Sequence, residues 1–203
     1  DRLVDITGEL TKPYLGVIKR DREDLLEQIT HFFHLGAIYD LEADEASQYA
    51  ANIEGTRHAL ELADELKAEC FHYVSSIAAA GLYPGTFYEN MFAEAGPLVN
   101  PYLQTKHDAE ALVRQHSAIP FRIYRPSMVV GDSGTGEMDK IDGPYYFFKL
   151  IQKLGENIPP WIPLVGIEGG QLNIVPVDFV ADALDFIAHL PDHDGECFHL
   201  TAD

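Results

Sequence analysis

Cysteine and basic residues are both scarce in this chain of 203 residues, and each scarcity disfavours a class of function. The two cysteines, Cys70 and Cys197, lie in short apolar runs without a CxxC spacing, so we expect two buried thiols rather than a disulfide or a zinc site. Fourteen Lys and Arg residues stand against 33 Asp and Glu, which gives a net charge of −19. This charge repels phosphate backbones and anionic lipids, and we expect no nucleic-acid partner.

Long apolar runs are absent as well. No run approaches the roughly 18 to 20 residues that a membrane-spanning helix requires, and the first residues, DRLVDITGEL, do not resemble a signal peptide. We therefore expect no integral membrane segment and a cytoplasmic location. The remaining composition, 46% hydrophobic and 23% charged, is typical of a globular chain with a packed core.

Strand-like and helix-like segments alternate along most of the chain, which is the pattern of a parallel sheet covered by helices. The sequence therefore predicts an α/β fold with a doubly wound parallel sheet of the Rossmann type. The strands are expected at residues 2–6, 31–37, 70–76, 121–131, shortly after 173, and within 196–203. The helices are expected from Asp21, over about 42–67, from about Val99, and after an N-capping Asp178.

The glycine-rich turn that opens most dinucleotide-binding sheets is missing from this sequence. Neither G-x-G-x-x-G nor G-x-x-G-x-x-G occurs. The chain begins on what looks like the third strand of such a unit. In the strand order 3-2-1-4-5-6, strands 1 and 2 fill the gap between 3 and 4. We therefore expect a longer polypeptide that supplies the first two strands.

Composition divides the chain into three parts. Residues 132–172 contain the glycine-, proline- and aromatic-rich stretches DGPYYFFKLIQKL and PPWIPLVGIEGG, which are typical of a segment that covers a substrate. Residues 1–131 are expected to form a partial dinucleotide-binding core (strands 3 to 6), and residues 173–203 to return to it. The aromatic residues of the middle part could line an acyl pocket, although core packing is the more frequent use of such residues. They are Tyr145, Tyr146, Phe147, Phe148 and Trp161.

The strongest single pattern is Tyr102-Leu-Gln-Thr-Lys106 on an expected helix. A spacing of four places the phenol and the ammonium on one helical face. A neighbouring positive charge favours the phenolate and lowers a phenol pKa from about 10 toward neutrality, so that Tyr102 can exchange a proton with a substrate oxygen. The same spacing also arises by chance in helices whose tyrosine and lysine are merely exposed neighbours.

Ser75 and Ser76 end the strand that begins at Cys70. This places them at the carboxyl edge of the sheet, where open α/β folds bind ligands. A serine hydroxyl there can stabilise a carbonyl oxygen that gains negative charge. The alternative is a helix cap or a turn bond. The following IAAAGLYPG lacks acidic first-turn residues, so capping explains the pair less well.

Four motifs strengthen this interpretation: Ser76-x4-Gly81, Tyr102-x3-Lys106, Asn52-Ile-Glu-Gly-Thr56 and Arg125-Pro-Ser-Met-Val-Val-Gly131. Together they resemble the extended short-chain dehydrogenases/reductases. Five segments look most like the branch that contains bacterial fatty acyl-CoA reductases and is related to the male-sterility domain. They are HFFHLGAIYD, VSSIAAAG, PYLQTKHDAE, GEMDKIDGPYYFF and NIVPVDFVADAL.

The resemblance implies a role for each residue of the triad. Tyr102 would be the general acid, Lys106 would lower its pKa and hold the nicotinamide ribose, and Ser76 would polarise the carbonyl. Ser75 is the alternative serine, and the family's five-residue spacing to Gly81 favours Ser76. The family's usual cofactor is NADPH.

The same resemblance implies where the cofactor lies. Gly8-Glu9-Leu10 stands where the family has Gly-Asp-Leu near the adenine, and a glycine at position 36 would let the backbone pass close to the cofactor. Asn52 would form hydrogen bonds near the strand edges, and Pro126 and Ser127 would line the nicotinamide side. For Arg125 and Pro126, a simple strand end is an equal alternative. The full expected cofactor-binding set is Gly8, Glu9, Leu10, Leu35, Gly36, Ala37, Asn52, Ser75, Tyr102, Lys106, Arg125, Pro126, Ser127 and Val129.

No metal site is expected, because the spacing of His31 and His34 on a strand sends their rings to opposite faces. The function that the resemblance implies is NADPH-dependent reduction of a fatty acyl-CoA to the aldehyde or the alcohol. One alternative is a related dehydrogenase, reductase or epimerase acting on a sterol, flavonoid or nucleotide sugar. A second is a non-catalytic module that senses dinucleotides. The apolar middle part favours a fatty acyl-CoA or fatty aldehyde, and the Ser-Tyr-Lys set argues against a sensor.

Overall fold

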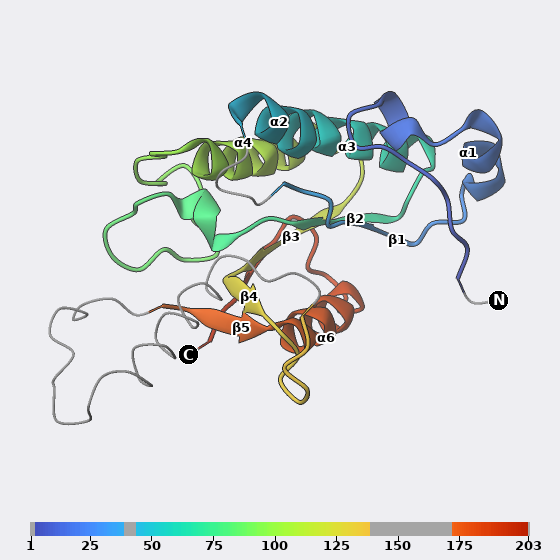
Figure 1. The fold of residues 1–203 in the computed structure, drawn as a ribbon. Helices are drawn as coiled ribbons and strands as arrows, with labels where there is room; N and C mark the ends of the chain where they lie inside the picture. The colour runs from blue at the N-terminus through green and yellow to red at the C-terminus, as the bar shows by residue number, and fades with distance from the viewer. Residues whose placement is uncertain (1–2, 39–43, 139–171, 203) are drawn as a thin grey trace, which may run out of the picture.

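The computed structural model describes residues 3–38, 44–138 and 172–202, and Figure 1 shows their arrangement. The larger sheet is parallel, with the order β1-β2-β3-β6. Its strands are β1 (His31–His34), β2 (Cys70–Val74), β3 (Phe121–Pro126) and β6 (Cys197–Leu200). A smaller parallel pair joins β4 (Met128–Val130) to β5 (Ile174–Pro176).

Helices cover both faces of the larger sheet, as Figure 1 shows. On one face lie α2 (Glu45–Tyr49), the π-helical η2 (Ala50–Glu54), α3 (Gly55–Glu65) and α4 (Pro101–His116). On the other lies α6 (Val177–Ala188). Three short helices complete the described part: η1 (Pro13–Gly16), α1 (Lys19–Leu25) and η3 (Ile77–Ala80). The doubly wound α/β fold of the Rossmann type is therefore confirmed.

Alternation along β2 and β3 divides the apolar side chains between two cores. Phe71, Tyr73 and Ile123 pack toward α3 and α4, whereas Tyr124 packs toward α6. This is the period-2 pattern of a strand that is buried on both faces. Cys70 and Cys197 are buried and unbridged, as expected.

The prediction of a strand at residues 2–6 is wrong for residues 3–6, the part of it that the structure describes. The chain from residue 3 to residue 9 has no regular structure, and Leu3 and Val4 are 86% and 83% exposed. A strand needs a neighbour to satisfy its backbone N–H and C=O groups, and none of the described strands lies beside this segment. Its short apolar run therefore finds no sheet to join.

Two expected boundaries also differ. The single strand expected over 121–131 is divided at Ser127, because β3 and β4 belong to different sheets. Asp178 is not the N-cap of α6: Pro176 occupies that position. The Asp178 carboxylate instead accepts hydrogen bonds from the backbone N–H and the hydroxyl of Ser133, at 2.9 and 2.5 Å. A long-range partner therefore replaced the local capping bond.

Strand pairing ends at His34 and Val74, three and two residues earlier than expected. Most of the expected substrate-covering segment, including its aromatic residues at 145–148 and 161, lies outside the described residues.

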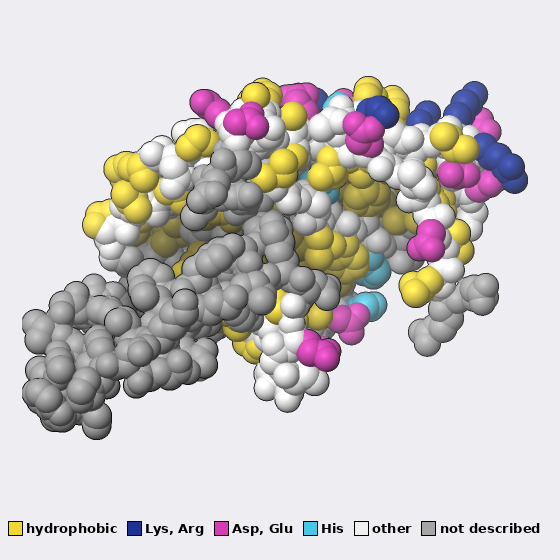
Figure 2. Space-filling model, in the orientation of Figure 1, with side chains coloured by type: hydrophobic (Ala, Val, Ile, Leu, Met, Phe, Trp, Pro, Cys, Tyr) yellow, Lys and Arg dark blue, Asp and Glu magenta, His cyan; other side chains and the backbone are white. Residues whose placement is uncertain are grey.

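Among the residues that are described, no helix has the length and apolar character to cross a membrane. In Figure 2, basic side chains gather mainly over α1, which carries Lys19, Arg20 and Arg22.

Phe71 offers a direct test of the core. Its side chain is fully buried and stacks on Phe32 with ring centroids 5.5 Å apart. We expect Phe71→Ala to lower the free energy of unfolding by about 3 to 5 kcal/mol, because it leaves a cavity. Urea denaturation measures this loss. Phe186→Ala, at a side chain that is 67% exposed, is the matched control and should change stability by less than about 0.5 kcal/mol. Equal denaturation midpoints for the two variants would contradict the assignment of the core.

Candidate active site

Ser76 lies two residues beyond β2 and begins η3. Its Oγ accepts a hydrogen bond from the backbone N–H of Ala78 at 3.1 Å, so it caps the short helix. The expectation that capping explains this serine poorly is therefore wrong. The hydroxyl of Ser76 also interacts with the phenol of Tyr102, where it opposes the rise in pKa that burial causes. Ser76 and Tyr102 are thus neighbours where η3 packs against α4.

Hydrogen bonds fix η3 to α4 and to the segment that precedes α4. His107 of α4 donates from Nδ1 to the carbonyl of Ala79 at 2.9 Å, and Gly96 donates from its N–H to Ala80 at 2.9 Å. Gly81 follows with a φ of +58°, and a Cβ there would lie 2.6 Å from the carbonyl oxygen of Gly96. The glycine of the Ser-x4-Gly motif is therefore required by a close crossing of two backbones.

Tyr102 lies in the first turn of α4, behind the N-cap Asn100, whose Oδ1 accepts from the N–H of Leu103 at 2.9 Å. Burial raises the pKa of the Tyr102 phenol above its usual value, and Ser76 opposes this shift only in part. The sequence predicted a lowered pKa through Lys106. That prediction is wrong for this structure, because the loss of hydration dominates.

Lys106 is buried one turn further along α4. Its Nζ donates to the carbonyl of Val74 at 3.1 Å and lies 5.4 Å from the centroid of the Tyr73 ring. Burial lowers the pKa of Lys106 to about 8, and the charge of Glu110 opposes this shift. Since Val74 is the last residue of β2, the ammonium, the phenol and the Ser76 hydroxyl all lie around the carboxyl end of that strand.

Asn52 joins the segment after β1 to α4. It lies in the π-helical turn η2, a distortion that is frequent at functional sites. Its Oδ1 accepts from the N–H of Ile38 at 2.8 Å, and its Nδ2 donates to the carbonyl of Ile38 at 2.9 Å and to Oγ1 of Thr105 at 3.1 Å. The expected hydrogen-bonding position is found, whereas a direct cofactor contact stays a prediction.

Two of the expected cofactor segments, 8–10 and 35–37, lie in contact. A Cβ on Gly36 would be 2.9 Å from Cδ2 of Leu10, and one on Gly55 would be 3.4 Å from Cβ of Leu10. The close approach at Gly36 is therefore made by Leu10, a contact that sequence analysis did not foresee. Leu35 beside it is 59% exposed, and Ala37 is half-buried.

Glu9 is exposed and held by local partners. Thr11 donates its hydroxyl to Oε1 at 2.7 Å, and Lys12 forms an ion pair with Oε2 at 2.5 Å. These two contacts lower the pKa of the Glu9 carboxyl. The preceding Gly8 permits a tight turn, since a Cβ there would lie 2.8 Å from the carbonyl oxygen of Leu15.

Arg125 does not lie free at the sheet edge. It is fully buried, and its guanidinium donates to both carboxylate oxygens of Glu110, at 2.6 and 3.0 Å. It also donates to the carbonyl of Met91 at 3.0 Å and to Nε2 of His199 at 3.2 Å. In this structure Arg125 contacts other residues of the protein core, and its expected contact with the cofactor stays a prediction.

Ser127 differs from Arg125 in this respect. It is buried, and its Oγ has no hydrogen-bond partner within the described residues. Its backbone N–H donates to the carbonyl of Leu200 at 3.0 Å, which fixes the residue between β3 and β4. A buried hydroxyl without a partner is rare in proteins and marks a position where a ligand can bind. Val129 follows in β4 and is half-buried.

Ser75 and Ser76 have different partners. The Ser75 hydroxyl donates to Oε2 of Glu110 at 2.7 Å, within the core, whereas Ser76 faces Tyr102. This geometry favours Ser76 as the serine that meets a substrate. Sequence analysis missed Glu110, although the repeat of four residues through Tyr102, Lys106 and Glu110 places all three on one face of α4.

His31 and His34 point to opposite faces of the sheet, as expected. The ring of His31 lies 2.9 Å from His72, and that of His34 lies 3.2 Å from the hydroxyl of Thr56. Within residues 3–38, 44–138 and 172–202, no group of three or more His, Cys, Asp or Glu side chains could hold a metal ion.

Comparison with known proteins finds consistent similarities. A family model of NAD-binding domains, described as male sterility protein, matches residues 1–184. The chain is 30% identical over 99% of its length to the non-canonical nonribosomal peptide synthetase FrzA of Cladobotryum sp. and 30% identical over 92% to the aldehyde reductase lnaA of Aspergillus flavus. The solved terminal R domain from the myxalamid PKS-NRPS biosynthetic pathway superposes with a TM-score of 0.81 at 29% identity, over 98% of this chain and 50% of that domain. The chain spans only about a fifth of the two curated relatives, 20% and 18%.

Asn52 provides a test of how the site is held together. We expect Asn52→Ala to accelerate amide hydrogen exchange at Ile38, because its side chain binds both the N–H and the C=O of that residue. Hydrogen–deuterium exchange with mass spectrometry measures this. Asn173→Ala is the matched control, since Asn173 binds the N–H and C=O of Ala202 in the same manner. It should accelerate exchange at Ala202 alone. An unchanged rate at Ile38 in Asn52→Ala would rule out the clamp.

Proposed function

Because the chain belongs to the male sterility family of NAD-binding domains, we propose that it is an NADPH-dependent reductase of acyl thioesters. The product is an aldehyde, which the same site can reduce to an alcohol. The observations that support the proposal lie around the carboxyl end of β2: Lys106 donates to the carbonyl of Val74, and Ser76, two residues further along, acts on the phenol of Tyr102. Open α/β sheets bind their ligands at this edge.

The residues present fit a dinucleotide. The buried hydroxyl of Ser127 has no hydrogen-bond partner among the described residues and can accept or donate a hydrogen bond at the nicotinamide side. The segment 36–38, held by Asn52, and the adjoining Gly8–Leu10 turn would hold the ribose and adenine side. NADPH bound there supplies the hydride.

Ser76 and Tyr102 have complementary tasks in this mechanism. The Ser76 oxygen accepts from Ala78, so its own proton remains available to a carbonyl oxygen that becomes negative during hydride transfer. In the first reduction, a hydride adds to the carbonyl carbon of the thioester, the C–S bond breaks, and the sulfur takes up a proton. The products are an aldehyde and a thiol. In the second reduction, the aldehyde gains a hydride at carbon, and Tyr102 donates a proton to its oxygen. The raised pKa of Tyr102 keeps the phenol protonated at neutral pH, the form that an acid catalyst needs.

Two observations bear on whether the acyl group is carried on coenzyme A or on a protein. The sequence resemblance points to fatty acyl-CoA. Relatives named as nonribosomal peptide synthetases, together with the terminal R domain, point to a thioester carried on a protein. A thioester carbonyl is common to both, and the relative named aldehyde reductase is consistent with the second reduction.

The test is cofactor oxidation by the full-length protein. We expect NADPH to be consumed with palmitoyl-CoA, with the same acyl group on a phosphopantetheinyl carrier protein, and with palmitaldehyde. NADH in place of NADPH identifies the preferred cofactor. UDP-glucose with NAD⁺ examines the nucleotide-sugar alternative and should give no turnover. No oxidation with any thioester or aldehyde would refute the proposal and favour a dinucleotide-sensing module.

Tyr102→Phe separates the two reductions. We expect aldehyde reduction to lose about 100-fold or more in kcat, because alkoxide formation requires the proton. Thioester reduction should lose less, since a departing thiolate needs little acid assistance. Single-turnover kinetics with each substrate measure the two steps. Tyr88→Phe, at a tyrosine that is 63% exposed, serves as the control. Equal losses in both steps would contradict this role for Tyr102.

The pKa of Lys106 predicts how kcat for aldehyde reduction depends on pH. Because burial lowers its pKa to about 8, the ammonium loses its proton as the pH rises through that value. If the charge of Lys106 supports proton transfer by Tyr102, kcat for aldehyde reduction falls on the alkaline side with a midpoint near pH 8. A kcat that stays constant up to about pH 10, close to the usual pKa of lysine, would show that the charge is not needed.

A further inference from the structure

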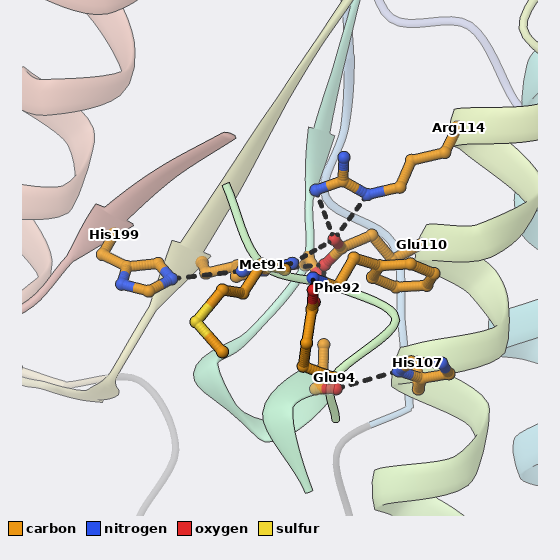
Figure 3. A network of polar contacts seen from close by, with 10 residues as sticks. Met91, Phe92, Glu94, His107, Glu110, Arg114 and His199 are labelled. Atoms are coloured by element: carbon orange, nitrogen blue, oxygen red, sulfur yellow. Dashed lines mark hydrogen bonds and ion pairs between the residues drawn. The ribbon is translucent and has the colours of Figure 1, made fainter. Parts of the chain in front are cut away.

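A buried carboxylate lies behind the candidate site. Glu110 is fully buried on α4, and Figure 3 shows it facing Arg114 of the same helix, while His199 approaches from β6. Oε1 accepts from Arg125 at 2.6 Å and from Arg114 at 2.9 Å. Oε2 accepts from Arg125 at 3.0 Å and from the Ser75 hydroxyl at 2.7 Å. Each oxygen therefore has two donors, which compensates the cost of burying the charge.

These bonds join three elements at the points where they reach the site. Ser75 directly precedes Ser76 after β2, and Arg125 lies two residues before Ser127 at the end of β3. Glu110 itself lies one turn beyond Lys106 on α4 and two turns beyond Tyr102. One side chain thus links the segment that carries the serine to the helix that carries the phenol and the ammonium.

Resting on the proposed reductase function, we infer that Glu110 is a positioning residue. Its carboxylate holds the Ser75 hydroxyl and thereby sets the place of the neighbouring Ser76 hydroxyl relative to Tyr102. Both bonds to Arg125 orient the carboxylate, since a guanidinium fork binds both carboxylate oxygens in one plane. Glu110 does not reach the substrate, because all its contacts face the core.

The charge of the same carboxylate also acts on Lys106, one turn earlier on α4. The groups around this ammonium are the carbonyl of Val74, the Tyr73 ring, the buried His34 and Glu110. The charge of Glu110 stabilises the protonated lysine, whereas the Ser75 hydroxyl carries no charge. Replacing Glu110 therefore changes the charge near Lys106, whereas replacing Ser75 does not.

The experiment uses Ser75→Ala, Glu110→Gln and the double variant in the full-length protein. Misplacement of a catalytic group by about 1 Å costs on the order of 100-fold in rate. We expect kcat for aldehyde reduction to fall about 10-fold in Ser75→Ala and about 100-fold in Glu110→Gln, with an unchanged KM for NADPH. The double variant should be no slower than Glu110→Gln, because both changes break one link. Asp108→Asn makes the same change of acid to amide at a half-buried position of α4 whose carboxylate binds only Gln104 in an exposed hydrogen bond. It is the matched control and should keep the wild-type kcat.

The pH profile separates positioning from loss of folded protein. Glu110→Gln should move the alkaline limb of kcat to lower pH, because Lys106 loses its stabilising charge. Ser75→Ala should lower kcat without moving that limb. A smaller amount of folded protein would leave the Glu110→Gln profile in place, so a shift of its alkaline limb excludes that explanation. The Ser75→Ala profile does not move, so circular dichroism gives the folded fraction of this variant and kcat is expressed per folded protein. With that correction, Ser75→Ala, which removes one hydroxyl, carries the test alone if Glu110→Gln does not fold.

The outcomes distinguish this inference from the proposed function. Wild-type protein that consumes no NADPH overturns the reductase proposal and the role of Glu110 with it. Active wild-type protein with a folded Ser75→Ala variant of wild-type kcat overturns only the positioning role. Additive losses in the double variant do the same, since they show that Ser75 and Glu110 act separately.

Discussion

The ion pair between Glu110 and Arg125 is the interaction on which the geometry of the site depends. Both side chains are fully buried, so neither charge has water to solvate it. The hydrogen bonds from Arg125 lower the pKa of Glu110 against the effect of burial. Removing one partner of such a pair leaves an unpaired charge and costs roughly 3 to 5 kcal/mol. The position of α4 relative to the ends of β2 and β3 is therefore strongly constrained.

The two sides of the site are connected through neighbouring residues of α4. The Thr105 hydroxyl accepts a hydrogen bond from the side-chain amide of Asn52, which holds the segment after β1. The adjacent Lys106 donates to the carbonyl of the last residue of β2. The region expected to hold the cofactor and the region expected to act on a carbonyl thus share one helical turn. Hydride transfer requires the two reactants at near-contact distance, and a shared rigid element provides this alignment.

Loss of hydration shifts the pKa values of Tyr102 and Lys106 more than neighbouring groups do. The pKa of Tyr102 is raised and that of Lys106 is lowered, both with loss of hydration as the main cause. A phenol that stays protonated, on the same helix as an ammonium with a pKa of about 8, suits proton delivery during reduction. The expected effect of Lys106 on Tyr102 considered the charge alone and not the loss of hydration, because four-residue spacing on a helix contains no information about solvent access.

The sequence by itself determined the features that depend on local periodicity. Spacings of two, three or four residues account for the alternating strands and helices, for the common helical face of Tyr102 and Lys106, and for the divergent faces of His31 and His34. The burial of both cysteines follows from the apolar residues beside them. Only the tertiary structure decided the contacts between distant segments. Four features depend on which segments meet: the bond between Ser75 and Glu110, the packing of Leu10 on Gly36, the bond between Asp178 and Ser133, and the lack of regular structure in the described residues 3–9. Side-chain chemistry is local, but a hydrogen-bond partner, a neighbouring strand and the access of water are supplied by the rest of the fold.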